Sequence, residues 1–158
     1  MTCSNELKVE QLLKCAKKIA CEYYKLTQRP LGVTGEVAEY EASQKLELKL
    51  EVARTALFDA SNEVGGRIVR YQIKGRAVDA HDRRRGRVSS IKCDGDFEEV
   101  LLVLLDKTTL DALEIWQASR ESVKQRLDNL NGQAARIRRS MNISQFISIP
   151  GVKKVWSV

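Results

Sequence analysis

The chain has 158 residues, 43% of them hydrophobic and 30% charged, which is the balance of a globular domain with room for a buried core. Twenty-seven Lys and Arg against 21 Asp and Glu give a net charge of +6, which favours polyanionic partners or marks an ordinary basic surface. No apolar run is long enough to span a membrane, and the four Cys show neither metal-finger nor disulfide spacing, so we expect a soluble, cytoplasmic protein.

Two helices are predicted first. Residues 4 to 27 carry apolar side chains at three- and four-residue spacing between Lys and Glu, which predicts an amphipathic helix in which Cys15 and Cys21 pack as small apolar side chains. Residues 34 to 46 predict a second helix capped by Thr34, with Glu36 in the first turn, where the helix dipole favours negative charge.

A strand is predicted over residues 67 to 76, because β-branched and aromatic residues alternate with polar ones there. Val69, Tyr71 and Ile73 then share one face, and Gln72 and Lys74 lie side by side on the other. A lysine on a partly buried face needs an anion opposite it.

Asp59 is the nearest candidate for that anion. The segment 61 to 66 is rich in turn-forming residues, so the chain is expected to return as an antiparallel hairpin. That return would bring Asp59 close to Gln72 and Lys74.

An arginine-rich segment follows. Residues 77 to 95 show no periodicity and are predicted to form an exposed loop. Its arginines, together with one at the end of the preceding strand, form either a phosphate-contacting arm or a solvated charge run: Arg76, Arg83, Arg84, Arg85 and Arg87.

The remaining elements are predicted as follows. Residues 97 to 105 form a strand whose fully apolar end indicates burial on both faces, and residues 111 to 117 form another. Ser119 caps a helix that reaches about residue 130, and helical or strand material follows from residue 143 to 156. Trp116 and Trp156 are expected to complete the core, unless Trp156 stacks on a base.

An acidic residue, a hairpin, and then Gln-Ile-Lys on the returning strand resemble the active-site signature of the PD-(D/E)XK nuclease superfamily, which has the restriction-endonuclease-like fold. The resemblance covers roughly residues 32 to 117. It implies that Asp59 is a metal ligand, that Gln72 stands at the second acidic position, and that Lys74 supports the attacking water. It also implies a further metal ligand on the preceding helix, with Glu36 a better match than Glu39.

The resemblance has one departure, because a carboxylate is commoner than an amide at the position of Gln72. An amide oxygen can bind Mg²⁺ but brings no charge, which leaves Asp59 and Glu36 to neutralise Mg²⁺ or Mn²⁺. Two functions therefore remain open: a metal-dependent nuclease acting on DNA, and an inactive nucleic-acid-binding or assembly subunit with the same fold. A third alternative is that the match is accidental in an ordinary α/β domain.

Taken together, these elements predict an α/β fold with a mixed β-sheet flanked by helices. We expect a single domain, in which residues 4 to 27 are an N-terminal helix and residues 118 to 158 a C-terminal extension of the nuclease-like core. Expected partners are DNA, contacted through its backbone, and a separate specificity or assembly subunit. A homodimer is also open.

Overall fold

The computed structural model describes residues 3–51, 58–131 and 137–158. Its helices are α1 (Cys3–Thr27), α2 (Thr34–Leu46), α3 (Arg120–Asp128) and α5 (Ile143–Ile147). Its strands are β1 (Lys49–Leu50), β2 (Ala60–Val64), β3 (Arg67–Val78), β4 (Glu99–Asp106), β5 (Ala112–Ser119) and β6 (Lys153–Ser157).

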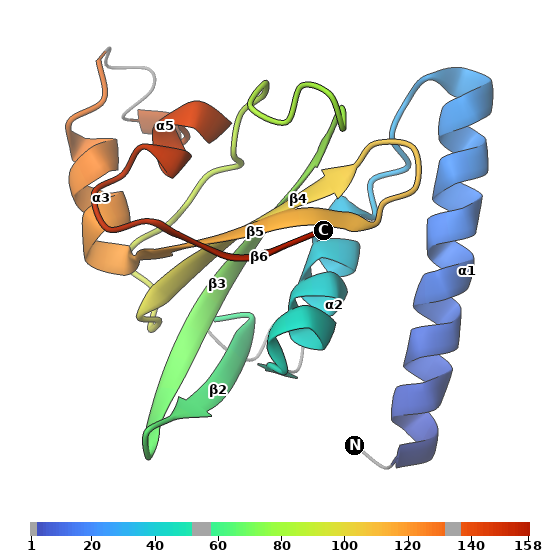
Figure 1. Ribbon diagram of the computed structural model, residues 1–158, viewed down its shortest axis with the longest axis horizontal. Helices are drawn as coiled ribbons and strands as arrows, with labels where there is room; N and C mark the ends of the chain where they lie inside the picture. The colour runs from blue at the N-terminus through green and yellow to red at the C-terminus, as the bar shows by residue number, and fades with distance from the viewer. Residues whose placement is uncertain (1–2, 52–57, 132–136) are drawn as a thin grey trace.

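The strands form one six-stranded sheet in the order β1-β2-β3-β4-β5-β6 (Figure 1). Neighbouring strands are antiparallel except β3 and β4, which run parallel. Helices cover both faces of the sheet, so the predicted α/β architecture with a mixed sheet flanked by helices is confirmed.

The β2–β3 hairpin turns on two glycines. Gly65 and Gly66 both have positive φ, 59° and 77°, and Val64 pairs with Arg67 across them. Two left-handed residues match the twist of a two-residue hairpin, and glycine adopts that conformation without a Cβ clash. The turn is narrower than predicted, because residues 61–64 belong to β2.

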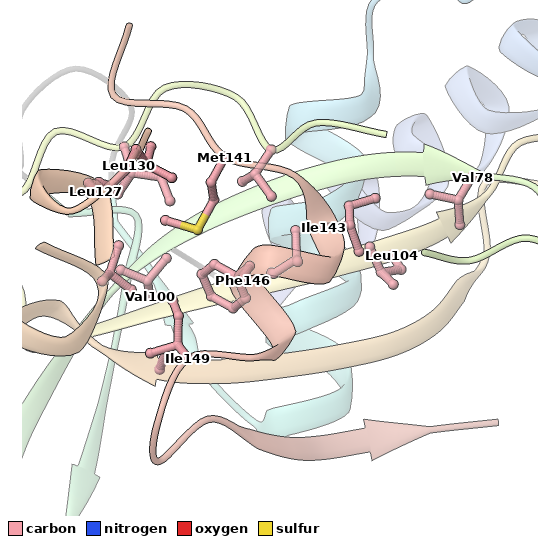
Figure 2. Packing of buried hydrophobic residues seen from close by; sticks show 14 of the residues in the cluster. Val78, Val100, Leu104, Leu127, Leu130, Met141, Ile143, Phe146 and Ile149 are labelled. Carbon is pink, nitrogen blue, oxygen red and sulfur yellow. The ribbon is translucent and has the colours of Figure 1, made fainter. Parts of the chain in front are cut away.

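Strand β4 lies at the centre of the core. Every residue from Val100 to Leu105 is fully buried, which confirms the prediction of a strand covered on both faces. Val100, Leu102 and Leu104 pack with α3, α5 and the segment that precedes β4, and Figure 2 shows Ile143 and Phe146 of α5 in this layer. Residues 101, 103 and 105 pack on the other face with α2.

Helix α2 packs very closely on β3. A Cβ atom added at Gly75 would lie 2.4 Å from the Cβ of Ala38 and 2.7 Å from the carbonyl oxygen of Thr34. Only a glycine on β3 and a small residue on α2 permit this approach. The helix has the predicted bounds, but Val33 and not Thr34 is its N-cap, and no side chain caps it.

Helix α1 forms as predicted, but its long apolar residues do not face the core. Leu12 and Ile19 are 68% and 61% exposed, whereas Ala20 is buried. The helix is held to the body partly by Lys17, whose ammonium donates to Glu41 at 2.8 Å and to Asp111 at 2.6 Å. Cys15 is exposed, so the expectation that it packs in the core was wrong.

The segment between β3 and β4 is not simply an exposed loop. It begins at residue 79, because β3 continues through Val78. Val88 and Ile91 are buried, and their backbone N–H groups donate to the carbonyl oxygens of Met141 and Arg139. Apolar side chains within an otherwise polar segment thus hold it over the sheet beside α5.

The C-terminal segment belongs to the same sheet. Ser119 caps α3 as predicted, with its hydroxyl accepting from the N–H of Ser122 at 3.2 Å. β6 then pairs with β5 and forms the edge of the sheet. Trp116 and Trp156 are partly buried against the two core layers, one on each face, as expected of core tryptophans.

Candidate functional site

The candidate site lies where the β2–β3 ladder ends. Ala60 and Tyr71 form its last strand pair. The N–H of Asp59 still donates to the carbonyl oxygen of Tyr71 at 2.8 Å, which places Asp59 opposite Gln72. The side chain of Asp59 is therefore delivered to the edge of β3, where β2 stops covering it.

Beyond the end of β2, the side chain of Asp59 forms hydrogen bonds with β3. Its Oδ2 atom accepts a hydrogen bond from the backbone N–H of Ile73 at 2.6 Å and a second from the Nε2 atom of Gln72. A β3 backbone donor that a neighbouring strand would otherwise pair is thus satisfied by a carboxylate. The hairpin brings Asp59 and Gln72 into direct contact.

Lys74 lies two residues further along β3, on the same face as Gln72. Across the parallel ladder, Gln72 is paired with Val100 and Lys74 with Leu102, so both side chains start from the face that carries α3 and α5. Both are partly buried. A partly desolvated ammonium at Lys74 requires negative charge nearby.

Glu39 carries negative charge that acts on Lys74, although it lies on α2, which packs on the other face of the sheet. Partial burial, which is the largest cause, and the negative charges of Asp59 and Glu36 together raise the pKa of Glu39 to about 7, while Lys74 acts to lower it. The charges of Asp59 and Lys74 thus act on Glu39, and we call these three residues the electrostatic cluster. Three elements, α2, the start of β2 and β3, contribute to it.

The sequence favoured Glu36 on α2, but the structure favours Glu39. Glu36 is exposed, whereas Glu39 is partly buried and follows Ala38, the residue in close approach to Gly75. The glycine immediately after Lys74 is the signal that could have identified Glu39. It marks where α2 touches β3, and Glu39, the residue after Ala38, is partly buried there.

The cluster has a donor set that suits a hard divalent cation. Carboxylates of Glu39 and Asp59 and the amide oxygen of Gln72 are all oxygen ligands of the kind that Mg²⁺ prefers. Burial and the neighbouring negative charges disfavour the ionised form of Glu39, and a bound cation would favour it. Within the described residues, however, no group of three or more His, Cys, Asp or Glu is placed to hold a metal, so the amide of Gln72 is needed.

The predicted arginine arm divides into two sets. Arg83 and Arg84 reach the carboxylate of Glu114, a residue of β5, with Nη1–oxygen distances of 3.4 Å and 2.7 Å. Arg87 donates to the carbonyl oxygen of Ser140 at 3.1 Å. Arg76 and Arg85 are exposed, and Arg87 is exposed apart from this hydrogen bond.

Fold and site together define an α/β protein with a mixed six-stranded sheet and two carboxylates, an amide and a lysine near the end of the β2–β3 ladder. No model of a known protein family matches the chain, and no curated protein matches it. Within the described residues, none of the helices is both long and apolar enough to cross a membrane.

Proposed function

We propose that the protein is a metal-dependent nuclease of the PD-(D/E)XK type that hydrolyses phosphodiester bonds in DNA. The observation that supports this most is the contact of Asp59 with Gln72 at the end of the β2–β3 ladder, with Lys74 and Glu39 close enough for their charges to interact. These groups come from separate elements, and the negative charges of Asp59 and Glu36 both act on the carboxyl group of Glu39. Carboxyl groups whose pKa is shifted by burial and by neighbouring charges are often found at functional sites.

Each residue has a distinct role in this proposal. Glu39, Asp59 and the Gln72 amide oxygen would hold Mg²⁺ or Mn²⁺, which supplies charge stabilisation at the phosphate and an activated water. The ammonium of Lys74 orients that water and offsets negative charge developing on the phosphate. The hydrogen bond from Ile73 N–H fixes the orientation of Asp59.

DNA is the proposed substrate because the surface is basic. Exposed Arg76, Arg85 and Arg87 would contact phosphates without reading bases, which predicts salt-dependent binding with little sequence preference. Sequence selection would then need a specificity or assembly subunit or a second copy of the chain. A reducing compartment such as the cytoplasm suits the protein, because Cys15, Cys21 and Cys93 are free thiols.

One observation favours the alternative of an inactive nucleic-acid-binding or assembly subunit. The Nε2 group of Gln72 donates to Asp59, so an amide satisfies this carboxylate without any metal. In a relic of a nuclease fold, that hydrogen bond would replace the lost cation. The two functions differ in whether the wild-type protein binds a divalent ion.

The test is cleavage of plasmid and linear DNA in Mg²⁺ or Mn²⁺, with calorimetric titration of Mn²⁺ beside it. Asp59→Ala, Lys74→Ala and Glu39→Gln should each abolish cleavage while circular dichroism shows an intact fold. Glu36→Gln is the matched control, because the same change one turn earlier on α2 alters an exposed carboxylate. It should keep most of the activity.

Gln72→Glu distinguishes the two functions. The change adds a negative charge at the metal ligands and should tighten Mn²⁺ binding if Gln72 faces the ion. A nuclease adapted to glutamine cleaves as the wild type, whereas a relic is inactive and gains metal affinity only after the change. Absence of Mn²⁺ binding in both proteins would refute the catalytic proposal.

A further inference from the structure

Glu114 is a buried carboxylate surrounded by cationic groups on the face of the sheet that carries α5. Its side chain is only 5% exposed, and its Oε2 atom accepts from Arg84 Nη1 and Trp116 Nε1, both at 2.7 Å. Its Oε1 atom receives longer contacts from Arg83 Nη1 at 3.4 Å and from Lys154 Nζ at 3.5 Å. These groups come from the β3–β4 segment, β5 and β6.

The cluster holds more positive charge than its carboxylate needs. Burial acts to raise the pKa of Glu114, but the hydrogen bonds from Arg84 and Trp116 outweigh it and lower the pKa to about 2. Glu114 is therefore ionised and already well stabilised by its two short contacts. Three cations around one carboxylate leave a local charge of +2.

The three cationic side chains around Glu114 are partly exposed to solvent and have N–H groups that Glu114 does not bind. The side chains of Arg83, Arg84 and Lys154 are 32%, 43% and 39% exposed. Contacts of 3.4–3.5 Å lie at the outer limit of hydrogen bonding, so Arg83 and Lys154 are only weakly engaged by Glu114. Each retains N–H groups that can turn to another acceptor.

The fold positions these cations firmly. Arg83 Nε donates to the carbonyl oxygen of Ala80 at 3.0 Å, which anchors its guanidinium group. Arg84 and Lys154 both lie over the ring of Trp116, at 5.3 Å and 5.1 Å from its centroid. Since Lys154 is the β6 partner of Trp116, strand pairing holds the ammonium there. Little side-chain ordering remains to oppose anion binding.

We propose that Arg83, Arg84 and Lys154 form a binding site for a phosphate group, built around Glu114 as its internal counter-ion. Guanidinium pairs suit phosphate geometry, and a lysine adds a point charge. The ligand occupies the solvent side of the cations, and Glu114 keeps them aligned from below. That the phosphate belongs to a nucleic acid rests on the proposed function, whereas the anion site itself does not require cleavage.

The indole N–H of Trp116 provides a direct readout, because it donates to the same carboxylate as Arg84. We would follow both tryptophan indole signals by NMR while adding either inorganic phosphate or a short DNA duplex. Trp156 serves as the internal control, since it lies against the other core layer. A shift of the Trp116 signal at a saturating concentration of either probe, with Trp156 unmoved, supports the site.

Two double variants with equal loss of charge complete the test. Arg83→Gln with Lys154→Gln keeps the Arg84–Glu114 pair and hence the fold, while Lys92→Gln with Lys153→Gln removes two exposed cations on the same two segments. The first should abolish the Trp116 shift and lower the salt slope of duplex binding by about one unit. The second should leave the Trp116 shift in place.

The possible results distinguish free phosphate from phosphate in a nucleic acid, and they test the anion site and the nuclease proposal separately. Movement of Trp116 with both probes identifies a general phosphate site, and movement with the duplex alone identifies a phosphate within a nucleic-acid chain. An unmoved Trp116 signal with both probes, or equal loss of the shift in the two double variants, overturns the inference. DNA cleavage with an unmoved Trp116 refutes the site alone, and a Trp116 shift without cleavage refutes only the nuclease.

Discussion

Glu39 should destabilise the metal-free protein near neutral pH. Its pKa is about 7 in the folded protein against an ordinary value of 4.5, because it is partly buried near Asp59 and Glu36. A carboxyl group with a raised folded pKa favours folding where it is protonated. That advantage is lost as the pH rises from the ordinary value through the folded pKa. Glu39→Gln keeps the shape of the side chain and removes the titration.

The expected gain follows from the two pKa values. One pKa unit corresponds to about 1.4 kcal/mol, so Glu39→Gln should raise the free energy of unfolding by up to about 3 kcal/mol at pH 8 and by only about 1 kcal/mol at pH 5. Urea denaturation of wild type and variant at both pH values, in the presence of a chelator, measures the difference. Glu39→Gln should thus stabilise the protein while it abolishes cleavage, which is the trade-off expected at a functional site.

Glu36→Gln is the control for this experiment. Its exposed carboxylate should change stability by at most a few tenths of a kcal/mol at either pH. A stability difference for Glu39→Gln that is the same at pH 5 and pH 8, or a loss of stability at pH 8, would refute the electrostatic cluster of Glu39, Asp59 and Lys74.

Three further outcomes are expected. Gly75→Ala should lower the free energy of unfolding by about 3 kcal/mol or more, since its Cβ would meet Ala38 and Thr34. Gly35→Ala is the control, because it has open space around it and should not lower the free energy of unfolding. Chemical denaturation measures both variants. Ser119→Ala removes the cap of α3 and should cost about 1 kcal/mol in the same assay. Exposed Cys15 should react with a thiol reagent faster than Cys93, where burial raises the pKa of the thiol; equal rates would contradict the exposure difference.

The elements were predictable because their signals are local. The glycine pair at residues 65 and 66 sets the hairpin turn, Ser119 caps α3, and the apolar run of β4 requires cover on both faces. Half of the candidate site follows from the same local information. A hairpin with a two-residue turn places Asp59 opposite Gln72 whatever the rest of the fold does.

Only the tertiary structure shows how the two glutamates of α2 differ in burial. Glu36 and Glu39 share one helix face, and the pattern of α2 does not say which of them is the more buried. Ala38 lies against Gly75, and Glu39 beside it is partly buried while Glu36 is exposed. Helix α1 shows the same limit, because its apolar spacing predicts a helix but does not say that Leu12 and Ile19 face away from the sheet.

The sequence alone also did not predict that Arg83 and Arg84 pair with Glu114. A run of arginines predicts positive charge, and whether it is solvated or paired depends on which strand lies beneath it. The antiparallel pairing of β4 with β5 brings Glu114 under Arg83 and Arg84, and the pairing of β5 with β6 adds Lys154. Turns, caps and strand periodicity are determined by neighbours in the chain, whereas charge pairing is determined by neighbours in space, and only the folded sheet supplies those.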